Sequence, residues 1–209
     1  MKRVILLSAI VGTLLWSETV QDKFGQHVVT TFELDLQKAK TLRLPYNPEY
    51  NPTSSIEMLL KLVKQKPDYY RGHYNLGLAY FVNDEYEKSK ASFDKAIKIR
   101  TKQNIKDATI FNSAGWSAMK AQDYKRAERL FLQGVANKTL NSKSSNASLF
   151  GNLGQLYFYT QRFDKALKYL NIAKDQYGSQ SVQVTIDSIK EIQKKVQLKR
   201  AKSKATPTI

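Results

Sequence analysis

The sequence predicts an all-α fold in which helix pairs stack into a solenoid, with one extra helix at each end. Three observations lead to this fold: a helix-pair pattern occurs three times, a glycine recurs in each copy, and apolar residues at helical spacing flank the copies. The copies read HYNLGLAYFVNDEYEKSKASFDKAI from His73, FNSAGWSAMKAQDYKRAERLFLQGV from Phe111 and FGNLGQLYFYTQRFDKALKYLNIA from Phe150. One such pair cannot bury its apolar face alone, so we expect the copies to stack.

The recurring glycines, Gly77, Gly115 and Gly154, lie 38 and 39 residues apart, each within the first predicted helix of its copy. Glycine inside a helix costs about 1 kcal/mol relative to alanine, so three glycines at one position need a structural reason. Small and large residues recur at fixed places in the second helix: Ser89, Ala127 and Ala166, then Phe93, Phe131 and Leu170. We therefore expect the two helices of each pair to approach closely at the glycine.

This arrangement of a small residue, an aromatic residue and an alanine resembles the tetratricopeptide repeat (TPR) family over roughly residues 70–178. The resemblance implies a right-handed helix-pair solenoid of three TPR units, and the repeats would cover about 70–103, 108–141 and 147–178. Two features depart from the family pattern. The spacing exceeds the usual period of about 34 residues. The second copy also has Ala118 where the others have a tyrosine, which we expect to leave room for Trp116.

Apolar residues at helical spacing extend the stack on both sides. Residues 55–66 have Ile56, Leu59 and Val63 on one helical face, and Pro67 ends the segment. We interpret this segment as the second helix of an earlier repeat whose first helix has been lost. A similar spacing predicts a capping helix over 181–200. The TPR domain would then cover residues 53–200, and residues 201–209 would form a basic flexible tail.

The N-terminus has the pattern of an export signal. Lys2 and Arg3 precede an uncharged apolar run from Val4 to Trp16. The run is shorter than the roughly 20 residues that a membrane span needs. Residues 1–17 are therefore either a cleaved signal peptide or an uncleaved N-terminal anchor, and a buried segment of a cytosolic protein is the third interpretation. We expect an exported protein, either periplasmic or anchored in the inner membrane with its repeats outside the cytoplasm.

Residues 18–52 stay unassigned. Val28, Thr30, Phe32, Leu34 and Leu36 alternate with polar residues, which is the period of a strand. An extended strand, the start of a helix and a mobile stalk all remain open for this segment.

The family register places a set of first-helix residues on the concave side of the solenoid, where large apolar side chains alternate with amides. This combination is typical of a groove that binds a protein or peptide partner. The predicted groove residues are Arg71, Tyr74, Asn75, Leu78, Phe81, Asn112, Trp116, Met119, Lys120, Asn152, Gln155, Phe158 and Tyr159. The alternative is that some of them are ordinary core residues. The charged clamp with which one TPR subclass holds a C-terminal carboxylate is absent, because Tyr74 and Leu78 occupy two of its positions.

Positive charge is concentrated near the C-terminus of a chain whose formal net charge is +16. Residues 190–204 contain seven Lys or Arg residues and one acidic residue. Such a segment is attracted to anionic membrane surfaces or envelope polymers, although a merely solvated surface is an equally weighted interpretation. The export signal argues against nucleic acid as the partner. The candidate residues for anionic contact are Lys194, Lys195, Lys199, Arg200, Lys202 and Lys204.

Catalytic chemistry finds no support in the sequence. The chain has no cysteine and two histidines, His27 and His73. It contains neither an H-E-x-x-H motif nor a glycine-rich phosphate loop. We therefore expect no enzymatic activity, no catalytic residues, no cofactor and no metal site.

Two functions remain as hypotheses. The first is an exported scaffold that holds a protein partner in its groove, within cell-envelope assembly or secretion. The second is a basic adaptor that binds an anionic polymer, membrane surface or nucleic acid through its convex face and C-terminal tail. Salt separates them, because binding to an anionic surface weakens steeply with ionic strength.

Overall fold

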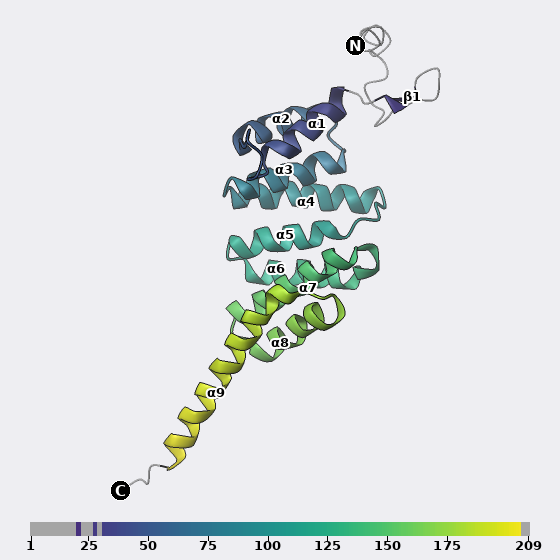
Figure 1. Cartoon of the computed structure of the whole chain (residues 1–209). Coiled ribbons are helices and arrows are strands. Elements are labelled where there is room, and N and C mark those ends of the chain that lie inside the picture. Colours follow the sequence, from purple (N-terminus) through teal and green to yellow (C-terminus); the bar gives the residue numbers. More distant parts are fainter. Residues whose placement is uncertain (1–19, 22–26, 29–30, 206–209) are drawn as a thin grey trace. The chain divides into compact units, whose positions relative to one another are not determined.

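The computed structural model describes residues 20–21, 27–28 and 31–205. The predicted signal peptide or anchor at 1–17 and the end of the tail, 206–209, lie outside these residues. The chain divides into two compact units, residues 1–104 and 105–209. The described part is mostly helical (Figure 1), which confirms the all-α prediction.

Unit 1 contains a short antiparallel strand pair, in which Val20 lies opposite Val28, followed by four helices that pack consecutively on one another. Its elements are β1 (Val20–Gln21), β2 (His27–Val28), α1 (Thr31–Leu42), α2 (Pro52–Gln65), α3 (Tyr70–Val82) and α4 (Tyr86–Lys102).

Helix α1 corrects the prediction that the first helix of an early repeat has been lost. It packs on α2, and the buried face consists of Phe32, Leu36, Ala39 and Leu42. The hydroxyl of Ser55 on α2 donates a hydrogen bond of 2.6 Å to the carbonyl of Ala39 on α1. Ser89 on α4 makes the same contact with Gly77 on α3, at 2.8 Å. The pair α1–α2 therefore repeats the geometry of α3–α4.

Unit 2 contains two helix pairs and a terminal helix. Helix α5 packs on α6, and helix α7 packs on α8. Helix α7 also contacts both α5 and α6. Its elements are α5 (Thr109–Lys120), α6 (Tyr124–Ala136), a 3-10 turn (Lys138–Leu140), α7 (Lys143–Tyr159), α8 (Phe163–Asn171), a π-helical turn (Ile172–Gln176), a 3-10 turn (Gln180–Val182) and α9 (Gln183–Ala205). Helix α7 begins four residues before the predicted start of the third repeat, and the Ser142 side chain caps it by accepting from the Ser145 amide.

The three recurring glycines lie where two helices approach closely, as their spacing predicted. A Cβ atom at Gly77 would lie 2.8 Å from the Phe93 ring, and one at Gly115 would lie 2.6 Å from the Phe131 ring. A Cβ atom at Gly154 would lie 2.6 Å from the Leu170 side chain. No larger residue fits these positions unless the facing side chain moves.

The turn between the two helices also has the same geometry in each repeat. Asp84, Gln122 and Gln161 adopt φ values of 58°, 59° and 58°, the left-handed conformation that ends many helices. The next amide in each turn returns to a carbonyl of the first helix, as in the bond of 2.9 Å from Asp123 N to Ala118 O. The three repeats therefore share both their core packing and their turns.

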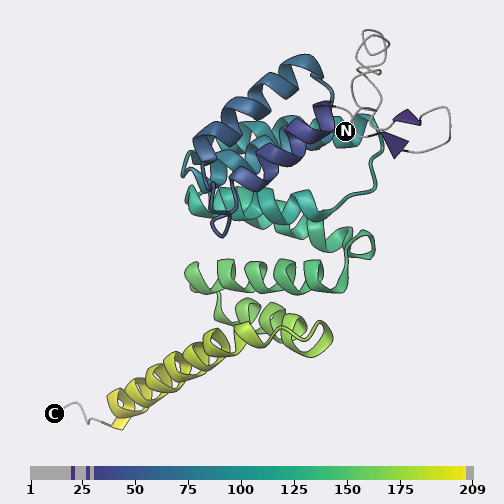
Figure 2. The ribbon, with the colours of Figure 1, turned by 45° about the horizontal axis from the view of Figure 1, so that its top comes forward.

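Helix α9 starts two residues after the predicted position and continues past the predicted end at 200, to Ala205. Ile186 and Ile189 are fully buried, whereas Val196 and Leu198 are 44% and 53% exposed. The second half of α9 thus extends away from the helices it caps (Figure 2). The basic segment up to Ala205 is helical, where the sequence analysis expected a flexible tail from residue 201.

Candidate partner-binding faces

The first helix of each repeat carries most of the predicted groove residues, and we call the surface they form the A-face of a unit. The A-face of unit 1 lies on α3 and consists of Arg71, Tyr74, Asn75, Leu78 and Phe81. The A-face of unit 2 lies on α5 and α7 and consists of Asn112, Trp116, Lys120, Asn152, Gln155, Phe158 and Tyr159. Two predicted residues are buried: Met119 is 6% exposed and belongs to the buried side of α5, and Asn75 is 4% exposed and lies beneath the A-face of unit 1 rather than on its surface.

An amide pair joins the two helices of the A-face in unit 2. The Nδ2 group of Asn152 on α7 donates a hydrogen bond of 3.0 Å to Oδ1 of Asn112 on α5. The two side chains are half-buried, and they meet because α5 and α7 are in contact. Trp116 lies one turn after Asn112 and is also half-buried, with the ammonium of Lys120 lying 5.4 Å from its ring centroid.

Aromatic side chains gather at the end of α7. The rings of Phe158 and Tyr159 lie 5.9 Å apart, and Phe158 lies 6.2 Å from Phe163 at the start of α8. Tyr159 is 57% exposed, while Gln155 and Phe158 are half-buried. The A-face of unit 2 therefore combines neutral amides with accessible aromatic rings.

The A-face of unit 1 has a different chemical character. Asn75 is only 4% exposed, and its Oδ1 accepts a hydrogen bond of 3.1 Å from Nη2 of Arg43. Its Nδ2 donates to the carbonyl of Arg71, at 2.7 Å. Tyr74 is half-buried, stacking on Tyr70 with centroids 6.0 Å apart, and Arg71 is exposed.

Sequence reasoning missed Arg43, which lies in the connection between α1 and α2. Burial lowers the pKa of its guanidinium from the usual value, and the neighbouring Tyr74 and Tyr46 act in the opposite direction. An arginine in this position stays charged because its reference pKa is so high. No periodic pattern marks a single residue in a loop, so the sequence offered no signal for it.

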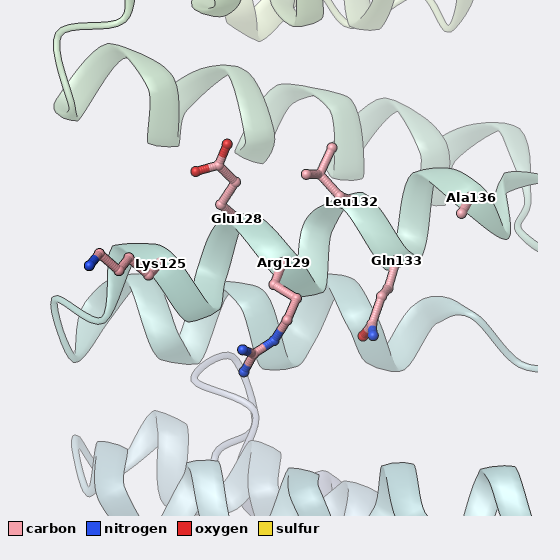
Figure 3. A pocket seen from close by; sticks show the side chains of 6 residues that line it. All are labelled: Lys125, Glu128, Arg129, Leu132, Gln133 and Ala136. Atoms are coloured by element: carbon pink, nitrogen blue, oxygen red, sulfur yellow. The ribbon is translucent and has the colours of Figure 1, made fainter.

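A second feature that the sequence did not indicate is a shallow depression of about 530 Å³ on α6. Its lining residues all belong to that helix: Lys125, Glu128, Arg129, Leu132, Gln133 and Ala136. Figure 3 shows Arg129 and Gln133 on one side of the helix and Glu128 and Leu132 on the other. The depression is open and has the mixed apolar and basic lining of an ordinary helix surface.

Glu128 is the centre of a polar network in unit 2. Its carboxylate accepts two hydrogen bonds from Arg162, at 3.1 and 2.8 Å, and one of 2.8 Å from the Tyr157 hydroxyl. The hydrogen bonds from Arg162 lower the pKa of Glu128. Burial, followed by the bond to Glu128, raises the pKa of Tyr157. Arg162 also lies over the Tyr157 ring at 4.4 Å, so the network fixes the turn between α7 and α8 against α6.

The predicted anionic-contact residues lie on α9. Lys194, Lys195 and Lys199 are exposed, and Lys195 pairs with Glu191 at 2.6 Å. Arg200, Lys202 and Lys204 continue the same helix.

Two kinds of site are absent from the part of the chain that the structure describes. Within residues 20–21, 27–28 and 31–205, His, Asp and Glu side chains form no group of three that could hold a metal ion. None of the described helices is both long enough and apolar enough to cross a bilayer.

The fold is that of a helix-repeat scaffold for protein–protein interactions. Residues 70–102 and 112–181 each match a tetratricopeptide repeat family model. The chain belongs to the tetratricopeptide repeat family, as the resemblance in its sequence implied. None of the curated proteins matches the chain.

Several solved structures have a similar fold. PilF of Pseudomonas aeruginosa is 15% identical, with a TM-score of 0.65 over 79% of this chain and 72% of PilF. A thermophilic TPR protein of Thermus thermophilus is 19% identical, with a TM-score of 0.58 over 77% of this chain and 81% of that protein. MamA of Desulfovibrio magneticus RS-1 is 17% identical, with a TM-score of 0.55 over 80% of this chain and 96% of MamA. At these identities the likeness concerns the fold.

Proposed function

We propose that this protein is an exported scaffold that holds a protein partner on its A-faces, within cell-envelope assembly or secretion. The observation that carries the proposal is the amide pair of Asn112 and Asn152, with Trp116 one turn away on α5. Membership of the family supports the general class, a scaffold for protein–protein interactions. These three residues support the A-face of unit 2 as the binding surface.

The amide pair has hydrogen-bonding capacity to spare. A side-chain amide offers two N–H donors and one oxygen with two lone pairs. The bond between Asn152 and Asn112 uses one donor and one lone pair. Within the described residues, neither side-chain amide makes another hydrogen bond. An extended polypeptide carries the complementary N–H and C=O groups along its backbone, so it can bind to both amides at once.

Trp116 adds the apolar part of the contact. Large aromatic side chains near the centre of an interface often dominate binding, and their truncation costs about 2 kcal/mol or more. We expect Trp116→Ala to abolish capture of the partner in a pull-down from native membranes. A thermal melt shows whether the variant stays folded, since surface substitutions usually change stability by less than about 0.5 kcal/mol.

A matched control removes an aromatic residue from the other helix of the same repeat. Tyr124 at the start of α6 is 38% exposed, and Tyr124→Ala should leave partner capture unchanged. If folded Trp116→Ala protein captures the same partner as the unmodified chain, the A-face of unit 2 is not the binding surface.

Export is supported by Lys2, Arg3 and the apolar run that follows them. A reporter that is active only outside the cytoplasm, fused after Ile209, should be active. N-terminal sequencing of the mature chain then separates a cleaved signal peptide from an anchor. A silent export reporter together with an active cytosolic one would refute this part of the proposal.

The alternative function is a basic adaptor, and the observation that favours it is the exposed second half of α9. Here Lys194 and Lys199 lie beyond the last buried residue, Ile189. Each Lys or Arg held near an anionic membrane contributes about 1 kcal/mol. If this function holds, binding to vesicles of anionic lipid should fall steeply between low and high salt. Partner capture on the A-face of unit 2, which consists mainly of amides and aromatic rings, should depend much less on salt.

A further inference from the structure

Arg43 and Asn75 form a preorganised cationic group on unit 1. Arg43 follows α1 directly, and Nη2 of its guanidinium donates to Oδ1 of Asn75 on α3 at 3.1 Å. Asn75 cannot turn its oxygen away, because its Nδ2 group is held by the carbonyl of Arg71 at 2.7 Å. The guanidinium is therefore fixed in position by a buried side chain that is itself fixed.

The surroundings of Arg43 leave its charge incompletely compensated. Its Nε atom is buried and has no hydrogen-bond partner in unit 1 as described. Within the described residues of unit 1, Arg43 forms no ion pair with a carboxylate. The side chains near the guanidinium include those of Tyr74 and Tyr46. A partly buried cation without a carboxylate is energetically unfavourable, so a ligand that brings one is stabilised.

The shape of the group indicates which anion fits. A guanidinium presents five N–H donors in a planar fork, which matches a planar carboxylate in a bidentate arrangement. The bond to Asn75 uses one of these donors. Arg71 is exposed on α3, one turn before Asn75, and adds a second positive charge to the same face. Tyr46, which is 83% exposed, and the half-buried Tyr74 offer apolar surface beside the charge.

We propose that unit 1 binds a carboxylate group of the partner polypeptide at Arg43, with Arg71 as a second cation and Tyr46 and Tyr74 as the apolar walls. The proposal rests on the proposed function, because it gives the A-face of unit 1 its ligand chemistry. It differs from the charged clamp of the known TPR subclass, whose first-helix positions hold Tyr74 and Leu78 here. The cation comes instead from the connection between α1 and α2.

The test uses proton–nitrogen correlation spectra of the full chain, in which arginine Nε–H groups give separate signals. Three hexapeptides with acetylated N-termini serve as probes: SGSEGS with an amidated end, SGSQGS with a free C-terminal carboxylate, and SGSQGS with an amidated end. We expect the Arg43 Nε–H signal to shift saturably with at least one of the two carboxylate peptides, with a Kd on the order of 1 mM, and not with the neutral peptide. The first two peptides distinguish a side-chain carboxylate from a chain terminus.

Variants separate a specific site from general attraction to a basic protein. The variants lack the Arg43 Nε–H signal, so the side-chain amide signals of Asn75, which lies against position 43, report binding in them. Arg43→Gln should weaken carboxylate binding at least tenfold, and Arg43→Lys should also weaken it, because lysine keeps the charge but loses the fork. Arg129→Gln on α6 removes the same charge at an exposed position in unit 2 and should change nothing. Circular dichroism shows whether Arg43→Gln folds, and if it does not, Arg43→Lys gives the result.

Several outcomes would overturn the proposal: no shift with either carboxylate peptide, equal shifts with the neutral peptide, or unchanged binding in both Arg43 variants. A shift of equal size with inorganic phosphate at the same ionic strength would make the group a general anion site and would also overturn it. Failure here is distinguishable from failure of the proposed function. If only this inference fails, Arg43→Gln binds the carboxylate peptides as well as the unmodified chain does, while Trp116→Ala loses the partner. If only the proposed function fails, Arg43→Gln loses the carboxylate peptides, while Trp116→Ala still captures the partner.

Discussion

The two units carry an asparagine at the same place on their first helices, yet the two amides are in different states. Asn75 and Asn152 both lie two residues before the packing glycine of their helix. In unit 1 the amide is buried and fixes the cation Arg43, whereas in unit 2 it is half-buried and pairs with another amide, that of Asn112. The repeat therefore fixes the position of the asparagine on the first helix. The side chain that contacts the amide, Arg43 or Asn112, determines what the amide can bind.

The cores of the two units are much more alike than their surfaces. Phe93 in unit 1 and Phe131 in unit 2 both have 0% exposure, and each lies against the glycine of its own repeat. The comparison thus predicts equal responses to changes in the core and unequal responses to changes on the A-faces.

The largest expected effect tests the shared core. Phe93→Ala and Phe131→Ala should each lower the free energy of unfolding by about 3–5 kcal/mol, because each removes a fully buried ring and leaves a cavity. Urea unfolding followed by circular dichroism measures both. Tyr159→Ala, at a side chain that is 57% exposed, is the control and should stay within about 0.5 kcal/mol. A loss below about 1 kcal/mol at either phenylalanine would show that the two cores are not equivalent.

The next effect tests the difference between the amides. Asn75→Ala removes the partner of a partly buried cation and should cost about 1.5–3 kcal/mol, the range for hydrogen bonds to charged groups. Asn152→Ala breaks a bond between neutral groups that water can replace, and it should cost about 0.5–1.5 kcal/mol. Urea unfolding of the two variants in the same buffer compares their losses in free energy of unfolding. Equal losses would contradict the distinction drawn between the two faces.

The pH dependence of stability should also differ between the units. Burial lowers the pKa of His73 in unit 1 below its usual value of 6.5, against the opposing hydrogen bond to the carbonyl of Pro67. Hydrogen bonds from Arg162 lower the pKa of Glu128 in unit 2 below its usual value of 4.5. A lowered folded-state pKa contributes stability that is complete above the unfolded pKa and is lost as the pH falls through the folded value.

Stability should therefore begin to fall below about pH 6.5 because of His73, and fall further below about pH 4.5 because of Glu128. Thermal melts across this range should show that His73→Gln removes the first decrease and that Glu128→Gln removes the part of the second that comes from the Arg162 pair. If His73→Gln leaves the curve between pH 5 and 6.5 unchanged, burial of His73 is not the cause.

The repeats could be predicted from the sequence because close packing leaves a visible pattern. Gly77, Gly115 and Gly154 are unfavourable in a helix unless a facing side chain needs the space, and the structure shows Phe93, Phe131 and Leu170 in that space. The same pattern gave the register of the A-faces, including Asn112 and Asn152. It could not show that Met119 turns to the buried side of α5, since a methionine fits either environment.

Helix α1 and Arg43 could not be predicted, for two separate reasons. The apolar residues at the start of α1 have a period of two, because Leu34 is apolar but 57% exposed, and this hid the helical face formed by Phe32, Leu36 and Ala39. Small Ala39 also replaces the glycine that marks the other repeats. Arg43 belongs to a loop, and only the fold brings it to Asn75, which is 32 residues away in the sequence.

The smallest expected effect concerns α9, which has no counterpart among the described residues of unit 1. Deleting residues 197–209 should change the free energy of unfolding by less than about 0.5 kcal/mol, because Val196 and Leu198 are exposed and the last buried residue is Ile189. Ile189→Ala is the contrasting variant and should cost about 2–5 kcal/mol, since it empties a fully buried site under the same helix. Thermal melts of the two variants therefore locate the point at which α9 stops stabilising unit 2. A large loss of stability on deletion would place Leu198 in the core and would remove the reason for treating the outer half of α9 as a free basic surface.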